Sequence, residues 1–199
     1  HRDLHSFPTR RSSDLILYST SSGPGVDNNL YFSQDSTDMD DECELEDRFS
    51  NDMASGDFNG DGYADLAVGI KWEDVGGASD AGAVAVIYGS AGGLSATAIS
   101  DQFLTLNDLD VAAVSQTYDM FGSSLAAGDF NGDGFCDLAV SAPQSDSPNP
   151  WYNGYVYIFA GNAQLADTTV ANEDQVLAPE QALFRMRYYP NPHSGDGSC

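Results

Sequence analysis

Oxygen-bearing side chains recur at a fixed spacing in two nine-residue stretches, residues 57–65 (loop 1) and 129–137 (loop 2). Each stretch has Asp or Asn at positions 1, 3, 5 and 9 and glycine at position 6. Three carboxylates and one amide oxygen match the all-oxygen shell that Ca²⁺ prefers, which a backbone carbonyl and water complete. The glycine permits the positive φ of a tight turn. The spacing therefore predicts one calcium site in each loop.

The expected ligands in each loop are the four polar side chains and the backbone carbonyl of position 7. They are Asp57, Asn59, Asp61, Asp65 and the Tyr63 carbonyl in loop 1, and Asp129, Asn131, Asp133, Asp137 and the Phe135 carbonyl in loop 2. The position-6 glycines, Gly62 and Gly134, are expected to have positive φ.

The pattern of the loops has two other interpretations. An EF-hand opens with the same pattern but needs a bidentate Glu at position 12 and flanking helices. Position 12 is Val68 in one copy and Val140 in the other, and an apolar, β-prone run follows each loop. The EF-hand is therefore disfavoured. Clusters of Asp, Asn and Gly also mark ordinary turns. That alternative stays open, although two copies with identical spacing weigh against it.

The composition is strongly acidic, with 31 Asp and Glu against 7 Lys and Arg and a formal net charge of −24. Such a surface repels nucleic acid and anionic lipid, so we expect no nucleic-acid partner and no direct membrane insertion. The charge suits a secreted or cell-surface protein that meets millimolar cations. A hydrophobic content of 41% favours a folded chain over a disordered one.

Few residues could support catalysis, and we expect the chain not to be an enzyme. All three histidines, at positions 1, 5 and 193, lie outside the repeated region, and Arg48 and Lys71 are the only basic residues between positions 16 and 179. A Ser-His-Asp or Cys-His site is therefore absent from that region. A carboxylate pair could still serve a glycosidase. Three cysteines make no disulfide framework, and Cys136 is expected to be a small core side chain.

The sequence repeats with a period near 72 residues, which relates position 57 to position 129. Each period contains four short apolar runs bounded by Gly, Asp, Asn or Pro, the pattern of short strands. We expect strands near 52–58, 64–70, 82–88 and 102–106, and again near 124–130, 136–142, 154–160 and 175–178. Residues 16–19 and 30–34 resemble the third and fourth strands of a preceding unit.

Four-stranded units in tandem are typical of propeller blades. We therefore predict an all-β fold, a partial β-propeller with two full four-stranded blades plus part of a preceding blade, from a longer protein. The expected divisions are a non-native, adapter-derived segment at 1–15, the remnant of the preceding blade and loop at 16–48, blades with calcium loops at 49–107 and 108–179, and a divergent tail at 180–199. The bare outer faces of these blades are expected to hold Val84, Val86, Tyr155 and Tyr157.

The chain closely resembles one known family of repeats. Phe121-Gly122, the aspartate-rich loop and Val140-Ser141-Ala142-Pro143 resemble the FG-GAP repeat, which builds the seven-bladed propeller of integrin α subunits and many bacterial surface proteins. The first unit departs from the pattern, with Phe49-Ser50 and Val68-Gly69-Ile70 at the corresponding places. The resemblance implies calcium in the loop between the first and second strands, held by the ten residues named above. It also implies ligand binding on the opposite face, at loops 35–48, 71–81, 107–120 and 143–153.

These expectations combine into a functional hypothesis. The chain is a calcium-binding FG-GAP propeller module for adhesion or ligand binding in a secreted or cell-surface protein, with an extracellular protein or glycan as the ligand. The alternative is a non-catalytic propeller appended to a secreted hydrolase.

Overall fold

The computed structural model describes residues 49–94, 102–108, 114–145 and 154–161 with their side chains, and strands at 14–16, 19–20, 23–24, 30–32 and 175–177 as backbone. Over these residues the chain consists of antiparallel strands and one 3₁₀ turn at Leu106–Asp108. None of the helical structure described is long and apolar enough to cross a membrane. The predicted all-β class is confirmed.

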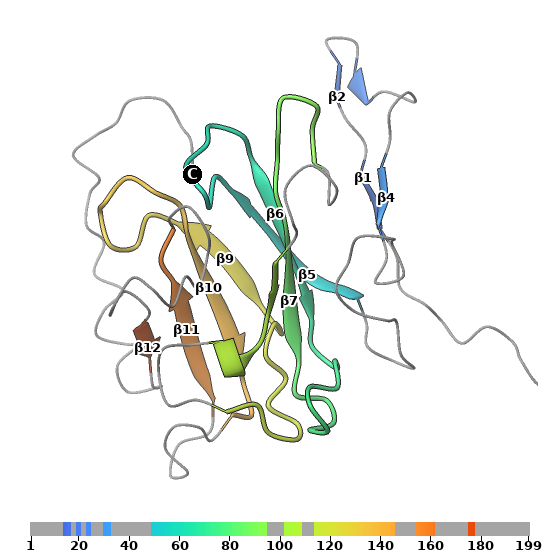
Figure 1. The fold of residues 1–199 in the computed structure, drawn as a ribbon, viewed down its shortest axis with the longest axis vertical. Coiled ribbons are helices and arrows are strands. Elements are labelled where there is room, and N and C mark those ends of the chain that lie inside the picture. The colour runs from blue at the N-terminus through green and yellow to red at the C-terminus, as the bar shows by residue number, and fades with distance from the viewer. Residues whose placement is uncertain are drawn as a thin grey trace, which may run out of the picture.

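Two four-stranded antiparallel sheets make up most of the described fold (Figure 1). The first contains β5 (Phe49–Gly56), β6 (Asp65–Ile70), β7 (Ala83–Ile87) and β8 (Gln102–Leu104) in that order. The second contains β9 (Leu125–Gly128), β10 (Asp137–Ala142), β11 (Tyr155–Phe159) and β12 (Gln175–Leu177) in that order. Every strand of these two sheets overlaps a range predicted from the sequence. Each sheet is a meander, so consecutive strands pair with one another.

The two sheets pack against each other through a shared apolar core. Phe121 lies at its centre, with its ring 5.9 Å from that of Tyr157 and 6.0 Å from that of Phe159, both in edge-on arrangements. Val84 and Val86 of the first sheet belong to the same core. Aromatic rings in such geometry add to the stabilisation that burial alone provides.

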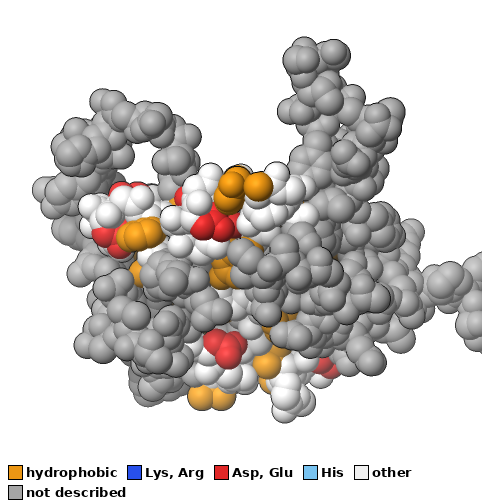
Figure 2. Space-filling view, turned by 45° about the horizontal axis from the view of Figure 1, so that its top comes forward, with side chains coloured by type: hydrophobic (Ala, Val, Ile, Leu, Met, Phe, Trp, Pro, Cys, Tyr) orange, Lys and Arg blue, Asp and Glu red, His pale blue; other side chains and the backbone are white. Residues whose placement is uncertain are grey.

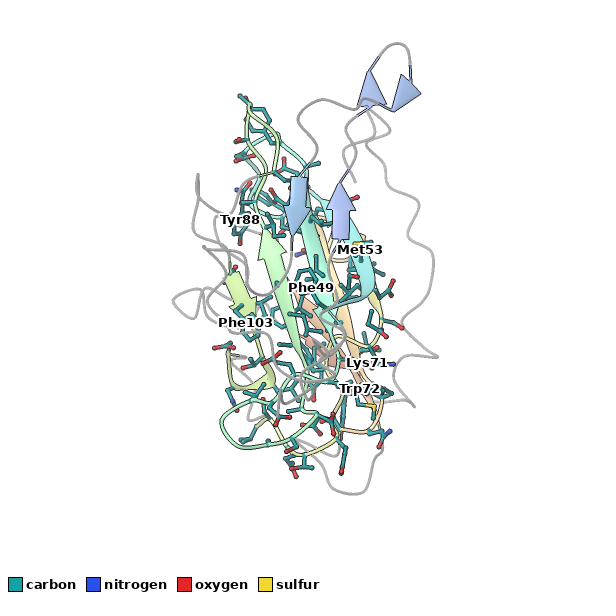
Figure 3. The ribbon with its side chains drawn as sticks, turned by 90° about the vertical axis from the view of Figure 1, so that its right-hand side faces the viewer. Phe49, Met53, Lys71, Trp72, Tyr88 and Phe103 are labelled. Carbon is teal, nitrogen blue, oxygen red and sulfur yellow. The ribbon has the colours of Figure 1, made fainter. Side chains whose placement is uncertain are left out.

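The third strands show which face of each sheet is covered. Every residue of β7 is buried, because this core covers one face and a second cluster, containing Phe49 and Ile87, covers the other. Figure 3 shows the first sheet from the side of that second cluster. In β11 the residues alternate, with Tyr157 buried and Ile158 half-buried.

This arrangement corrects one prediction. Val84, Val86, Tyr155 and Tyr157 lie in the core between the sheets and are at most 5% exposed, so they are not on bare outer faces. An alternating pattern distinguishes two faces of a strand but does not identify which one meets the neighbouring sheet.

Backbone and side-chain hydrogen bonds also join the two repeats. The Phe121 N–H donates to the Ala81 carbonyl at 2.9 Å. Asn51 Nδ2 donates to the Ser123 carbonyl at 2.8 Å, and the Leu125 N–H donates to Asp52 Oδ2 at 2.9 Å. These bonds fix the first strand of each sheet relative to the other repeat.

Four short strands precede the first sheet. β1 (Asp14–Ile16) pairs with β4 (Leu30–Phe32); β4 falls within the predicted range 30–34, whereas β1 shares only Ile16 with the predicted range 16–19. β2 (Ser19–Thr20) pairs with β3 (Gly23–Pro24) in a hairpin that was not predicted. β1 includes Asp14 and Leu15, two residues of the segment expected to be adapter-derived; the origin of that segment and the division boundaries stay predictions. The tail at 180–199 lies outside the described residues.

Candidate metal centre

Both aspartate-rich loops lie at the same end of the two sheets (Figure 1). Loop 1 connects β5 to β6, and loop 2 connects β9 to β10. The position-9 aspartates, Asp65 and Asp137, are the first residues of their strands, while the other expected ligands precede the strand. The meander topology therefore places two equivalent turns side by side.

The position-9 aspartate anchors each loop to the end of the third strand. Asp65 is 1% exposed; its Oδ2 accepts from the Phe58 N–H and its Oδ1 from the Gly89 N–H, both at 2.8 Å. Asp137, which is fully buried, makes the same two bonds with Phe130 and Gly161, again at 2.8 Å. A carboxylate that closes a turn in this way has a structural role whether or not a metal is bound.

Burial raises the pKa of both anchors above the ordinary aspartate value, and the bonds from the backbone amides oppose the rise. A neighbouring carboxylate adds to the raised pKa, from Asp61 for Asp65 and from Asp133 for Asp137. A cation between the paired carboxylates would remove that repulsion.

The remaining oxygens of loop 1 point inward, toward the amides of their own turn. Asp57 accepts from the Asp61 N–H through Oδ1 at 3.0 Å and from the Gly62 N–H through Oδ2 at 2.9 Å. Asn59 Oδ1 accepts from the Asp61 N–H at 3.0 Å. Asp61 Oδ1 accepts from the Tyr63 N–H at 2.8 Å. The expected side-chain ligands of positions 1, 3 and 5 thus turn toward the backbone amides of their own loop.

Loop 2 repeats these bonds and adds one, from the Gly132 N–H to Asp129 Oδ1 at 2.6 Å. Asp129 accepts from the Asp133 N–H at 3.2 Å and from the Gly134 N–H at 3.1 Å. Asn131 Oδ1 accepts from the Asp133 N–H at 2.8 Å, and Asp133 Oδ1 accepts from the Phe135 N–H at 2.8 Å. The position-6 glycines have φ of 88° and 96°, so their predicted positive φ is confirmed.

The donor atoms are of the chemical type that calcium prefers. Every polar side chain in the two loops offers oxygen, and an ionised carboxylate has about four lone-pair sites, so the amide bonds leave acceptor capacity for a metal. The side chains are not drawn into a ready-made cluster, however. Across the described ranges, no three Asp, Glu, His or Cys side chains are grouped so that they could hold a metal ion. Their oxygens bond to the loop amides instead.

Among the residues that the structure describes, no basic side chain lies beside the loops to balance their charge. Lys71 is the only basic residue in the part of the chain that the structure describes, and its Nζ lies 5.1 Å from the centre of the Trp72 ring. Figure 3 shows Lys71 at the end of the sheet opposite Tyr88, which adjoins the Asp65-bound Gly89. The crowded carboxylates of the loops would therefore gain from an external cation.

No role was predicted from the sequence for the two glycines whose N–H groups donate to Asp65 and Asp137. A Cβ added at Gly89 would lie 2.3 Å from the Ala64 carbonyl oxygen, and one at Gly161 would lie 2.3 Å from the Cys136 carbonyl oxygen. Only glycine lets the third strand approach so closely. The signal was present, since the 72-residue period relates Gly89 to Gly161.

Cys136 belongs to the buried core as expected, at 1% exposed, but it is disulfide-bonded, which was not predicted. The other cysteines, at positions 43 and 199, lie outside the described residues.

Large apolar side chains stand exposed beside the acidic oxygens at the loop end. Tyr63 and Phe135 at position 7 are 44% and 41% exposed, and Phe130 at position 2 of loop 2 is 50% exposed. Figure 2, in which this end is turned forward, shows hydrophobic side chains next to carboxylates. At the opposite end Tyr118 is 54% exposed, whereas Trp151 and Tyr152 lie outside the described residues.

Comparison with known proteins identifies the class. The family model of the FG-GAP repeat matches residues 49–87 and 121–159, ranges that contain loop 1 and loop 2. The chain therefore contains two FG-GAP repeats, and the resemblance drawn from the sequence is confirmed. Since FG-GAP repeats form propeller blades, the two sheets are two blades of a partial β-propeller; the described residues form no closed ring.

Curated relatives include two kinds of protein. The chain is 41% identical over 112 residues to phosphatidylinositol-glycan-specific phospholipase D of Mus musculus, an overlap that covers 56% of this chain and 13% of the relative. It is 32% identical over 142 residues to integrin alpha-PS5 of Drosophila melanogaster, covering 70% of this chain and 12% of the relative. It is 33% identical over 138 residues to integrin alpha-7 of Mus musculus, covering 66% and 10%. The chain thus spans a small part of each relative's length.

Proposed function

We propose that this chain is a calcium-binding FG-GAP module that serves adhesion or ligand binding in a secreted or cell-surface protein. The single observation that carries the proposal is the repeated hydrogen-bond pattern of the two loops, which turns the same oxygens inward in both copies. Both copies therefore present the same set of oxygens at the same positions, as two equivalent cation sites require.

Each loop would hold one Ca²⁺ through the ten residues predicted from the sequence. They are Asp57, Asn59, Asp61, Tyr63 and Asp65 in loop 1, and Asp129, Asn131, Asp133, Phe135 and Asp137 in loop 2. Bound calcium would supply positive charge to a group of carboxylates that has no cationic side chain nearby among the described residues. The effect is structural, because it would stabilise a turn that connects the first two strands of a blade.

The binding role rests on the family and on the acidic, aromatic-bearing surface. Exposed aromatic side chains such as Tyr118 are frequent anchors in recognition. The proposed ligand is an extracellular protein or glycan, because a chain of net charge −24 repels nucleic acid and anionic membranes. Binding should depend on calcium only indirectly, through the stability of the blades.

A second candidate has a specific observation in its favour. The identity to the phospholipase D of Mus musculus, 41% over 112 residues, exceeds the 32–33% identity over 142 and 138 residues to the two integrin chains. The module would then be a non-catalytic propeller appended to a secreted hydrolase. Reading the complete gene separates the two, since an adjoining catalytic domain supports the second candidate and its absence supports the first.

Thermal unfolding of the full chain in millimolar CaCl₂ and in chelator tests the calcium proposal. At about ten times Kd, one site should contribute roughly 1.4 kcal/mol of stability through binding to the folded state alone. An unchanged midpoint would contradict calcium binding. Screening the calcium-loaded chain against immobilised extracellular proteins and glycans then tests the binding role, which predicts a saturable ligand.

A further inference from the structure

The ring of Phe135 in loop 2 lies directly on the backbone of Gly60 in loop 1. A Cβ added to Gly60 would be 2.3 Å from Cε1 of that ring and 2.7 Å from Cδ1, so the ring occupies the space of the missing side chain. Gly60 has a φ of 71° and sits between Asn59 and Asp61, two expected ligands of loop 1. A residue of one repeat therefore covers the metal loop of the other.

Expected ligands of loop 2 hold Phe135 in this position. Its N–H donates to Asp133 Oδ1 at 2.8 Å. Its Cβ lies 2.9 Å from the place a Cβ on Gly161 would take, and the Gly161 N–H donates to Asp137 Oδ1 at 2.8 Å. Ordering Asp133 and Asp137 around a cation would therefore also fix the ring that rests on Gly60.

Phe130, in the same loop, serves as an internal control for Phe135. It is exposed to a similar degree, 50% against 41% for Phe135, and is not an expected ligand. A Cβ added to Gly128 would lie 3.2 Å from its ring, so Phe130 covers a glycine of its own repeat. The two phenylalanines thus differ in which repeat they contact.

We propose that Phe135 is a positioning residue that couples the two metal loops, so that a cation in either loop raises the affinity of the other. The inference rests on the proposed calcium binding. A ring held in place by an occupied loop 2 restricts the unbound conformations of loop 1, which lowers the ordering cost of the second binding event. Coupling between sites is reciprocal. Repulsion between two bound cations alone would give the opposite sign.

Terbium luminescence of the full chain tests the coupling. Tb³⁺ substitutes for Ca²⁺ and is sensitised by a tyrosine beside it, so Tyr63 reports on loop 1, whereas Phe135 hardly absorbs at the tyrosine wavelength. Loss of the signal in Tyr63→Phe confirms that assignment. We expect Asp133→Ala, which disables loop 2, to weaken terbium binding at loop 1 about fivefold, near the lower end of typical coupling.

The decisive variant is Phe135→Ala, which keeps every side-chain ligand and the position-7 carbonyl. It should weaken loop 1 by a similar factor, and adding Asp133→Ala should then have little further effect, because the two changes interrupt the same connection. Phe130→Ala should leave loop 1 unchanged. If Phe135→Ala does not fold in chelator, Phe135→Leu replaces it, with a smaller loss expected.

Two results overturn the coupling. One is a loop 1 affinity that is the same in the unaltered chain, in Asp133→Ala and in Phe135→Ala. The other is an equal loss in Phe130→Ala, which would indicate a general effect of removing an aromatic side chain. The absence of any terbium response in the unaltered chain would overturn the calcium proposal and the coupling together, so the two failures are distinguishable.

Discussion

Ser50 and Gly122 occupy the same place in the two repeats, and both have a left-handed backbone, with φ of 65° and 84°. The first repeat therefore retains the conformation of the Phe-Gly signature without its glycine. A non-glycine residue in this region is strained by about 1–2 kcal/mol. At Gly122 a Cβ would also lie 2.3 Å from the Ala83 carbonyl oxygen, so glycine is required there for space as well.

Ser50→Gly should stabilise the chain by about 0.5–1 kcal/mol, since relief of the strained φ outweighs the added freedom of glycine in the unfolded state. Gly122→Ser should destabilise it by more than that, because the new side chain meets the Ala83 backbone. Urea unfolding of both variants measures the two effects. Destabilisation by Ser50→Gly would show that the serine side chain has a role of its own.

Asp61→Ala and Asp133→Ala should each lower thermal stability mainly when calcium is present. Each removes one site, worth roughly 1.4 kcal/mol at about ten times Kd. In chelator the change should be small, because relief of repulsion between crowded carboxylates offsets the lost amide bond. Melting curves with and without calcium provide the measurement.

Asp74→Ala is the matched control for these two variants. Asp74 Oδ1 accepts from the Asp80 N–H at 2.8 Å in a different loop, so its loss should cost the same stability in calcium and in chelator. A calcium-independent effect of Asp61→Ala, like that of the control, would contradict the linkage between loop 1 and calcium.

Tyr157 should make the fold sensitive to alkali. Burial raises its pKa to about 12; the bond with Ser145, whose Oγ lies 3.4 Å from the phenol oxygen, opposes the rise, and the charge of Asp119 adds to it. The folded state thus holds the proton more tightly than the unfolded state, whose pKa is near 10. This contribution is intact below pH 10 and falls as the pH rises toward 12, by roughly 2–3 kcal/mol.

Tyr157→Phe removes that proton and should reduce the alkaline loss. We expect the free energy of unfolding to drop less between pH 9 and about pH 11.5 in the variant than in the unaltered chain. Denaturant unfolding at the two pH values gives the comparison. An identical drop in both proteins would show that other groups account for the alkaline sensitivity.

Local patterns predicted the strands and the turns well. The strands follow short apolar runs, and the position-6 glycines adopt the expected φ, because both properties depend on neighbouring residues in sequence. Contacts between repeats were harder to predict. Val84 and Tyr157 were assigned to outer faces because alternation does not reveal which face is covered.

In the candidate site too, local features could be predicted from the sequence and long-range contacts could not. The oxygens of positions 1, 3 and 5 accept hydrogen bonds from amides of their own loop, a local consequence of the loop sequence. The anchoring of Asp65 on Gly89 spans 24 residues, and the contact of Phe135 with Gly60 joins different repeats. Both depend on how strands and sheets pack, which loop spacing does not encode.

The central claim is that each loop binds one Ca²⁺. A calcium titration of the full chain, monitored by NMR of the loop amides, tests this claim most directly. The account predicts two calcium-dependent transitions, one reported by Gly62 and the other by Gly134, with Kd on the order of 10⁻⁴–10⁻³ M. Magnesium should compete poorly, because it demands a tighter octahedral shell. Loop amides that do not respond to calcium, or that respond equally to magnesium at the same concentration, would contradict the account.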